Sequence, residues 1–91
     1  MHIHNNSESV YQDSVRVRTY SQANKIFSDK PNKKLYHYHS GNLANDRELR
    51  KIRGNYDLDK IGKLFYKMAE TKNCQIFQKT IDGVCHYFCR Y

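Results

Sequence analysis

Residues 73–91, NCQIFQKTIDGVCHYFCRY, hold two runs of strand-forming residues on either side of Asp82-Gly83. An Asp-Gly pair is favoured in the two-residue type I′ turns that close β-hairpins. Such a turn sets a register in which these residues face one another: Phe77 and Phe88, Ile81 and Val84, Ile76 and Cys89, Cys74 and Tyr91. An isolated two-stranded ribbon is only marginally stable, so the hairpin needs a packed neighbour.

The preceding segment, DLDKIGKLFYKMAETKN at residues 57–73, has the pattern of that neighbour. Asp57 is a suitable N-cap, and apolar residues recur at helical spacing. We therefore predict a helix over 58–72 that buries one stripe and exposes another. The buried stripe consists of Leu58, Ile61, Leu64, Phe65, Met68 and Ala69, and the exposed face holds Lys60, Lys63, Tyr66 and Lys67.

Two further strands are predicted from alternation. In SVRVRTY, residues 14–20, Val15, Val17 and Thr19 alternate with a basic outward face. In KLYHYHS, residues 34–40, the two histidines lie on one side and the two tyrosines on the other.

Two further helices complete the pattern. The stretch SQANKIFSD, residues 21–29, begins a helix with Ser21 as N-cap, and Pro31 lies beyond its end. A helix over 46–53 follows the second strand, capped by Asn45 or Asp46, with Leu49 and Ile52 facing inward.

After the first strand, the predicted elements run helix, strand, helix, helix, strand, strand. This is the order of a winged helix, a helix-turn-helix followed by a hairpin wing. We predict a single α+β, winged-helix-like domain over residues 15–91, with helices packed on the C-terminal hairpin, after a flexible N-terminal arm at 1–14. In the alternative, an α+β sandwich, the first strand joins the hairpin in a larger sheet, so that residues 15–20 lie beside residues 84–91 and the sheet, not the helix, is the working face.

The charge of the chain points to a polyanionic or acidic partner. The 91 residues carry a formal net charge of +7, and residues 15–45 hold six Lys and Arg against one Asp. Tyrosines are interleaved with basic residues in RVRTY, KKLYHYH and CHYFCRY, which suits phosphate contacts combined with base stacking. The predicted contact residues are Arg16, Arg18, Lys33, Lys34, Tyr36, Tyr38, Arg47, Arg50, Lys60, Lys63, Tyr66, Lys67 and Lys79. The alternative for the lysines at 60–67 is an ordinary solvated helix face.

The cysteines and histidines do not predict a metal site or a catalytic centre. Cys85 and Cys89 lie four residues apart on an extended strand, roughly 13 Å, which is too far to share one zinc ion. His37 and His39 are typical of partly buried strand residues, and no second histidine at a fixed distance completes an acid–base pair with either. We expect no cofactor and no enzymatic activity.

The chain has no long apolar run, so we expect no membrane span and a cytoplasmic protein. Three cysteines, an odd count, are expected as free thiols in a reducing compartment. A monomer or a homodimer fits the sequence equally well.

The stretch YHYHSGNLANDREL, the helix after it and FQKTIDGVCHYFCRY together resemble small uncharacterised phage and prophage accessory proteins. This resemblance implies a small, separately expressed protein of a mobile element, acting in transcription control or against a host defence such as a CRISPR complex. Two hypotheses follow. One is a regulator that binds DNA through the 58–72 helix and the wing, and the other is an anti-CRISPR-like inhibitor that docks on a host protein or beside a guide RNA.

Overall fold

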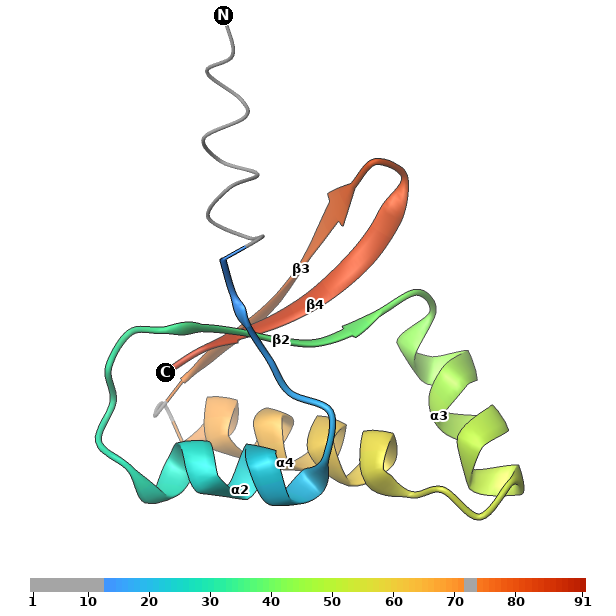
Figure 1. Ribbon diagram of the computed structural model, residues 1–91, viewed down its shortest axis with the longest axis horizontal. Coiled ribbons are helices and arrows are strands. Elements are labelled where there is room, and N and C mark those ends of the chain that lie inside the picture. Colours follow the sequence, from blue (N-terminus) through green and yellow to red (C-terminus); the bar gives the residue numbers. More distant parts are fainter. Residues whose placement is uncertain (1–12, 72–73) are drawn as a thin grey trace, which may run out of the picture.

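The computed structural model describes residues 13–71 and 74–91. The described residues form an α+β fold in which helices pack on a mixed sheet (Figure 1). The elements are β1 (Val15–Arg16), α2 (Tyr20–Ser28), β2 (Leu35–Ser40), α3 (Leu43–Ile52), α4 (Asp57–Glu70), β3 (Gln75–Ile81) and β4 (Val84–Arg90). The predicted fold class and element order are confirmed, while the likeness to a winged helix stays a prediction.

The hairpin β3–β4 has the predicted register. Phe77 pairs with Phe88, Ile81 with Val84, and Ile76 with Cys89. Asp82 and Gly83 have φ angles of 51° and 78°, both positive, as a type I′ turn requires. Local turn chemistry is thus sufficient to set the pairing of the whole hairpin.

The sheet has the strand order β1-β2-β4-β3. β2 pairs antiparallel with β4, and β1 pairs parallel with β2. The first strand therefore joins the hairpin in one larger sheet, as the alternative expects, but its expected place beside residues 84–91 is wrong, because β2 separates them. The first strand is also shorter than predicted, since β1 contains only Val15 and Arg16. Val17, which follows it, is buried, whereas Val15 is exposed at the sheet edge.

The helix starts differ from the predicted caps for local reasons. Thr19, not Ser21, caps α2. Its hydroxyl oxygen accepts from the Gln22 amide at 3.2 Å, and the Thr19 amide donates to the Gln22 side-chain oxygen at 3.1 Å, which completes a capping box. Asn42 caps α3 by accepting from the Asn45 amide at 3.0 Å, since Asp46 is engaged elsewhere. Tyr56 takes the N-cap position of α4, so Asp57 becomes its first residue.

Phe65 of α4 joins the two layers of the fold. Helices α2 and α4 lie side by side below the sheet (Figure 1). The Phe65 ring is fully buried and makes edge contacts with Phe27 of α2 and Tyr38 of β2, with centroids 5.5 and 4.7 Å apart. Leu58 and Ile61 of the predicted stripe are buried beside it. The amphipathic pattern therefore identified the core face of α4 correctly.

Helix α3 does not bury its apolar residues as predicted. Leu49 is 46% exposed and Ile52 is 80% exposed. The reason is that α3 extends to the side of the sheet and packs mainly on α4, so no element of the described residues covers its far face (Figure 1). Apolar spacing alone predicted the helix, but it could not predict whether another element would pack on the apolar face of that helix.

Two predictions fall partly outside the described residues. The N-terminal arm at 1–14 includes residues 1–12, and the predicted end of the long helix includes residue 72. Neither is described.

Replacing Phe65 by alanine is expected to lower the free energy of unfolding by about 3–5 kcal/mol, since the cavity lies where both layers meet. Its neighbour Tyr66 is 61% exposed, so Tyr66→Ala is the matched control and should change stability by less than about 0.5 kcal/mol. Urea denaturation followed by circular dichroism measures both. Equal losses in the two variants would contradict the assignment of the core.

Candidate nucleic-acid interface

The predicted contact residues lie in separate places on the structure. One group, at β1 and the loop before β2, comprises Arg16, Arg18, Lys33 and Lys34. A second, on α3 and α4, comprises Arg47, Arg50, Lys60, Lys63, Tyr66 and Lys67. Lys79 on β3 stands apart from both, exposed and opposite His86 of β4.

Tyr36 and Tyr38 are buried, at 7% and 6% exposed, so the prediction that their rings are displayed to a ligand is wrong. Tyr36 contributes only to the wall of a hollow next to β1. Both side chains belong to the buried core between the sheet and the helices. The Tyr38 ring packs against Phe65, and burial raises the pKa of its hydroxyl. The tyrosine side of the alternation in β2 faces the helices, where the core between the two layers lies.

Three basic residues of α3 and α4, namely Arg47, Lys51 and Lys63, surround one buried carboxylate. The Asp59 side chain is 8% exposed, and its Oδ1 accepts from Nε and Nη2 of Arg47 at 3.0 and 2.7 Å. Lys63 lies 3.1 Å from the other oxygen, and Lys51 lies 3.8 Å from Oδ1. The Arg47 hydrogen bond is the main cause that holds the pKa of Asp59 below its usual range. Part of the positive charge of this group is therefore neutralised within the protein.

The remaining lysines of α4 are less confined. The Lys60 ammonium lies 5.8 Å from the centre of the Tyr20 ring, a cation–π contact between α4 and α2. Lys67 and Tyr66 are exposed on the same helix. The predicted contact face of α4 thus exists, but several of its charges have partners in the protein.

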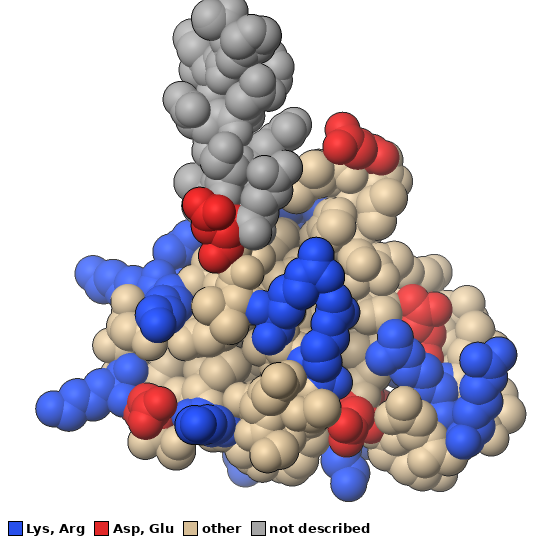
Figure 2. All heavy atoms as spheres, viewed as in Figure 1, with Lys and Arg blue, Asp and Glu red and all other residues tan. Residues whose placement is uncertain are grey.

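The other group lies in a more strongly positive region, which we name the β1 surface. It is formed by the basic residues of the segment 16–34: Arg16, Arg18, Lys25, Lys30, Lys33 and Lys34. Among residues 13–71 and 74–91, the ion pairs within 4.0 Å include none of them. Figure 2 shows basic side chains over β1 and over the loop that leads into β2.

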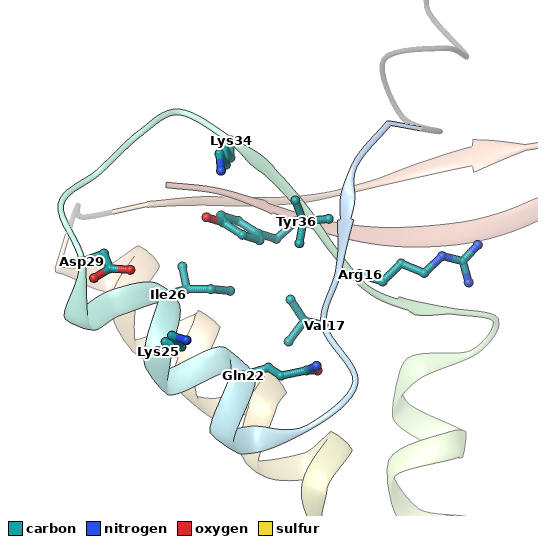
Figure 3. A pocket seen from close by; sticks show the side chains of 9 residues that line it. Arg16, Val17, Gln22, Lys25, Ile26, Asp29, Lys34 and Tyr36 are labelled. Atoms are coloured by element: carbon teal, nitrogen blue, oxygen red, sulfur yellow. The ribbon is translucent and has the colours of Figure 1, made fainter.

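A hollow of about 290 Å³ lies between β1, α2 and this loop (Figure 3). Val17, Ile26 and Tyr36 supply its apolar wall, and Lys25 and Lys34 lie at its rim with Asp29. Arg16 also lines it, with its guanidinium extending from β1 away from α2 (Figure 3). The hollow is therefore apolar inside and mainly positive at its edge.

Backbone contacts fix the loop that carries Lys33 and Lys34. The Asn32 and Lys33 amides both donate to the Tyr91 carbonyl, the former at 3.0 Å, and the Tyr91 hydroxyl donates to the Asp29 carbonyl at 3.2 Å. Arg90 adds a hydrogen bond to the Lys33 carbonyl at 2.9 Å. The lysines are thus displayed from a braced turn, which lowers the entropy cost of ordering them on a ligand.

A second hollow, of about 340 Å³, lies on the other side of β1, toward the hairpin tip. Its wall includes His37 and His86, whose Nε2 and Nδ1 atoms are 3.0 Å apart. His37 is only 7% exposed, and burial, with His86, Arg16 and Arg18 nearby, lowers the pKa of its imidazole to about 4. His37 is therefore neutral at physiological pH. Arg16 lines this hollow too, so the β1 surface continues into it.

The partnership of His37 and His86 was missed by the sequence reasoning, which found no second histidine for His37. It arises because β2 and β4 pair, with a register shift between His37 and His39, across 49 residues of sequence. The only sequence signal was the alternation of each strand, and this does not reveal which strands are neighbours.

The other chemistry-bearing residues have structural roles. His39 and Asp46 are joined at 2.7 Å, which ties the end of β2 to α3. Cys74, Cys85 and Cys89 are free thiols, and burial raises the pKa of Cys74 and Cys89, so these two do not ionise readily. In the described ranges no group of three or more His, Cys, Asp or Glu gathers as for a metal ion. No helix there is long and apolar enough to cross a membrane.

The low pKa of His37 predicts a pH-dependent stability. As the pH falls from 6.5 to about 4, the unfolded chain takes up a proton on this imidazole and the folded chain does not, so the free energy of unfolding falls. The contribution approaches about 1.4 kcal/mol per pH unit at most. Urea denaturation at pH 7, 6, 5 and 4 should show a steeper decline for the wild type than for His37→Gln. Parallel curves would contradict the burial of a neutral imidazole.

Comparisons of the chain with family models, with curated proteins and with solved structures gave no match. The functional argument therefore depends on the residues of this chain and on the geometry described above.

Proposed function

We propose that the protein is a small basic nucleic-acid-binding protein, without enzymatic activity of its own, that contacts its ligand through the β1 surface. The observation that carries this proposal is the distribution of charge. The basic residues of segment 16–34 have no carboxylate partner within 4.0 Å among the described residues, whereas Arg47 and Lys63 share Asp59. Positive charge that is not compensated locally is what a phosphate backbone recognises.

The shape of the β1 surface supports the same function. Arg16 lies on the strand between two hollows, one bordered by Lys25 and Lys34 and the other by His37 and His86. An extended phosphate chain that crosses β1 would meet Arg16 on the strand itself and Lys25 and Lys34 on the side of α2. The α4 lysines, predicted from the sequence as the main contact, become a secondary surface in this proposal.

A second candidate function is docking on a protein, as an anti-CRISPR-like inhibitor of a host defence complex. Exposed apolar side chains favour it: Leu49 and Ile52 on α3 and Tyr56 just after it are 46%, 80% and 50% exposed. The two functions are compatible, because α3 lies at the opposite end of the molecule from the basic loop before β2 (Figure 1). The three free thiols fit the cytoplasm of a host cell as the site of action for either function.

The experiment compares two matched triple variants. Each removes three exposed cations: one combines Arg16→Gln, Lys25→Gln and Lys34→Gln, the other Lys60→Gln, Lys63→Gln and Lys67→Gln. Binding to random single-stranded and duplex oligonucleotides is measured by fluorescence anisotropy between about 50 and 200 mM salt. We expect the first variant to bind roughly 10-fold or more weakly and to lose about 0.7–0.9 of salt slope per lost phosphate contact.

The α4 variant should keep most of the affinity. A larger loss of affinity in the α4 variant than in the β1 variant would show that the interface lies on α4. Absence of any binding by the wild type at low salt would overturn the proposed function and leave protein docking as the remaining candidate.

A further inference from the structure

The sheet ends on one side in a long strand whose outer edge pairs with no described strand. In the order β1-β2-β4-β3 the two outermost strands are β1, of two residues, and β3, of seven. Natural sheets protect an outer edge with proline, several charges, a bulge or a very short strand. The sequence of β3, QIFQKTI, has one lysine and no proline, and its register with β4 runs without a bulge. Within the described residues, this edge is therefore open to another strand.

The backbone groups that the edge presents follow from the strand pairing. The Cys85 carbonyl of β4 accepts from the Gly41 amide, just after β2, at 2.8 Å. Alternate residues of β4, starting from Cys85, therefore direct their amides and carbonyls away from β3, and the residues between them bond to it. By the same alternation, three residues of β3 direct their backbone groups outward: Ile76, Gln78 and Thr80. In the part of the chain that the structure describes, the backbone hydrogen bonds outside the helices and the sheet include none of these three.

We propose that two copies of this chain pair antiparallel along the outer edges of β3, with a two-fold axis at Gln78. In this register Gln78 faces Gln78 of the second copy, and Ile76 of each copy faces Thr80 of the other. Each pair exchanges both of its backbone hydrogen bonds, so every outward amide and carbonyl of the three residues is satisfied. A register displaced along the strand would leave some of them unpaired. The edge is thus self-complementary, as a two-fold dimer requires.

The side chains of β3 are compatible with the same register. Lys79 is the only charged residue of the strand, and it falls opposite Phe77 of the second copy and not opposite another lysine. Like charges directly opposite one another would destabilise the pairing. On the other face of the strand, Ile76 meets the methyl group of Thr80. No cross-strand pair in the joined sheet therefore opposes the association.

The charge of the chain determines how such a dimer responds to salt. Each copy has a formal net charge of +7, so two copies repel one another, and salt screens this repulsion. A single pair of strand edges makes a small interface, which is typical of transient complexes. Added salt should therefore strengthen the dimer, whereas it weakens binding to a phosphate backbone.

The proposed dimer leaves the β1 surface uncovered. β1 lies at the opposite side of the sheet from β3. In the joined sheet the two β1 strands are therefore the outermost strands, and both basic surfaces stay accessible. The dimer is a proposal about a protein partner, and its test needs no nucleic acid.

Sedimentation equilibrium of the full chain, without nucleic acid, tests the proposal between about 5 and 500 μM protein. We expect the average mass to rise with concentration from 10.9 kDa toward twice that value. The rise should begin at a lower concentration in about 0.5 M salt than in about 0.1 M salt, because the repulsion is screened. A mass that stays at 10.9 kDa at every concentration and both salt levels would overturn the inference and leave nucleic-acid binding untouched.

Charge exchange at the two-fold axis tests the register. Gln78 is exposed, so Gln78→Lys and Gln78→Glu should both keep the fold, which circular dichroism establishes. Each variant alone places two like charges opposite one another and should dimerise about 5-fold more weakly than the wild type. An equimolar mixture of the two should recover the dimer, because an ammonium then faces a carboxylate.

Gln75→Lys is the matched control, since it adds the same charge to an exposed position of β3 away from the axis. We expect it to change dimerisation by less than about 2-fold. Equal losses in Gln78→Lys and Gln75→Lys, or a mixture of the Gln78 variants that stays monomeric, would show that the copies do not pair along β3 at Gln78.

Discussion

The antiparallel pairing of β2 with β4 is the interaction on which the rest of the structure depends. It joins Leu35 to Arg90 and His37 to Phe88, residues that are far apart in the chain. β2 therefore becomes an inner strand, and its residues 35–39 are all buried. The same pairing brings the loop before β2 against Tyr91 and places His37 beside His86. The hollow toward the hairpin tip, which residues of β1, β2 and β4 line together, depends on this one pair of strands.

The two basic regions differ because of where the carboxylates lie, not because of how many cations each has. Asp59 is buried between α3 and α4, where a charge interacts more strongly than at the surface, and it engages Arg47 and Lys63. This carboxylate holds α3 against α4. Its negative charge also lowers the positive potential on the surface of these two helices. The segment 16–34 contains only Asp29 as an acid, and its cations remain directed to solvent. A net charge of +7 indicates the class of partner, and only the placement of the acids indicates the face.

The features predicted correctly from the sequence are local ones. The hairpin register follows from the Asp82-Gly83 turn, and the buried stripe of α4 follows from a period that repeats over four turns. The features that were predicted wrongly depend on neighbours distant in sequence. Alternation divided β2 into two sides, but it did not reveal that helices would cover the side of Tyr36 and Tyr38. Likewise the spacing of Leu49 and Ile52 indicated a helix face without indicating that this face stays largely exposed.

The candidate site shows the same division. The basic composition of residues 16–34 was evident in the sequence. Its importance relative to α4 was not evident, because Asp59 neutralises Arg47 through a tertiary contact that the sequence does not reveal. The pair of His37 and His86 needed knowledge of the β2–β4 register, including the shift between His37 and His39. Non-local strand pairing is the least predictable element from sequence pattern, since periodicity carries no information about partners.

The most direct test of the central claim is a backbone amide NMR titration of the full chain with a 12-nucleotide single strand. The 10.9 kDa protein is small enough for complete assignment. Binding through the β1 surface predicts the largest shift changes at residues 16–18, 25–30 and 33–36, on β1, α2 and the loop before β2. Changes confined to residues 47–53 and 60–67 would contradict the account and assign the interface to α3 and α4.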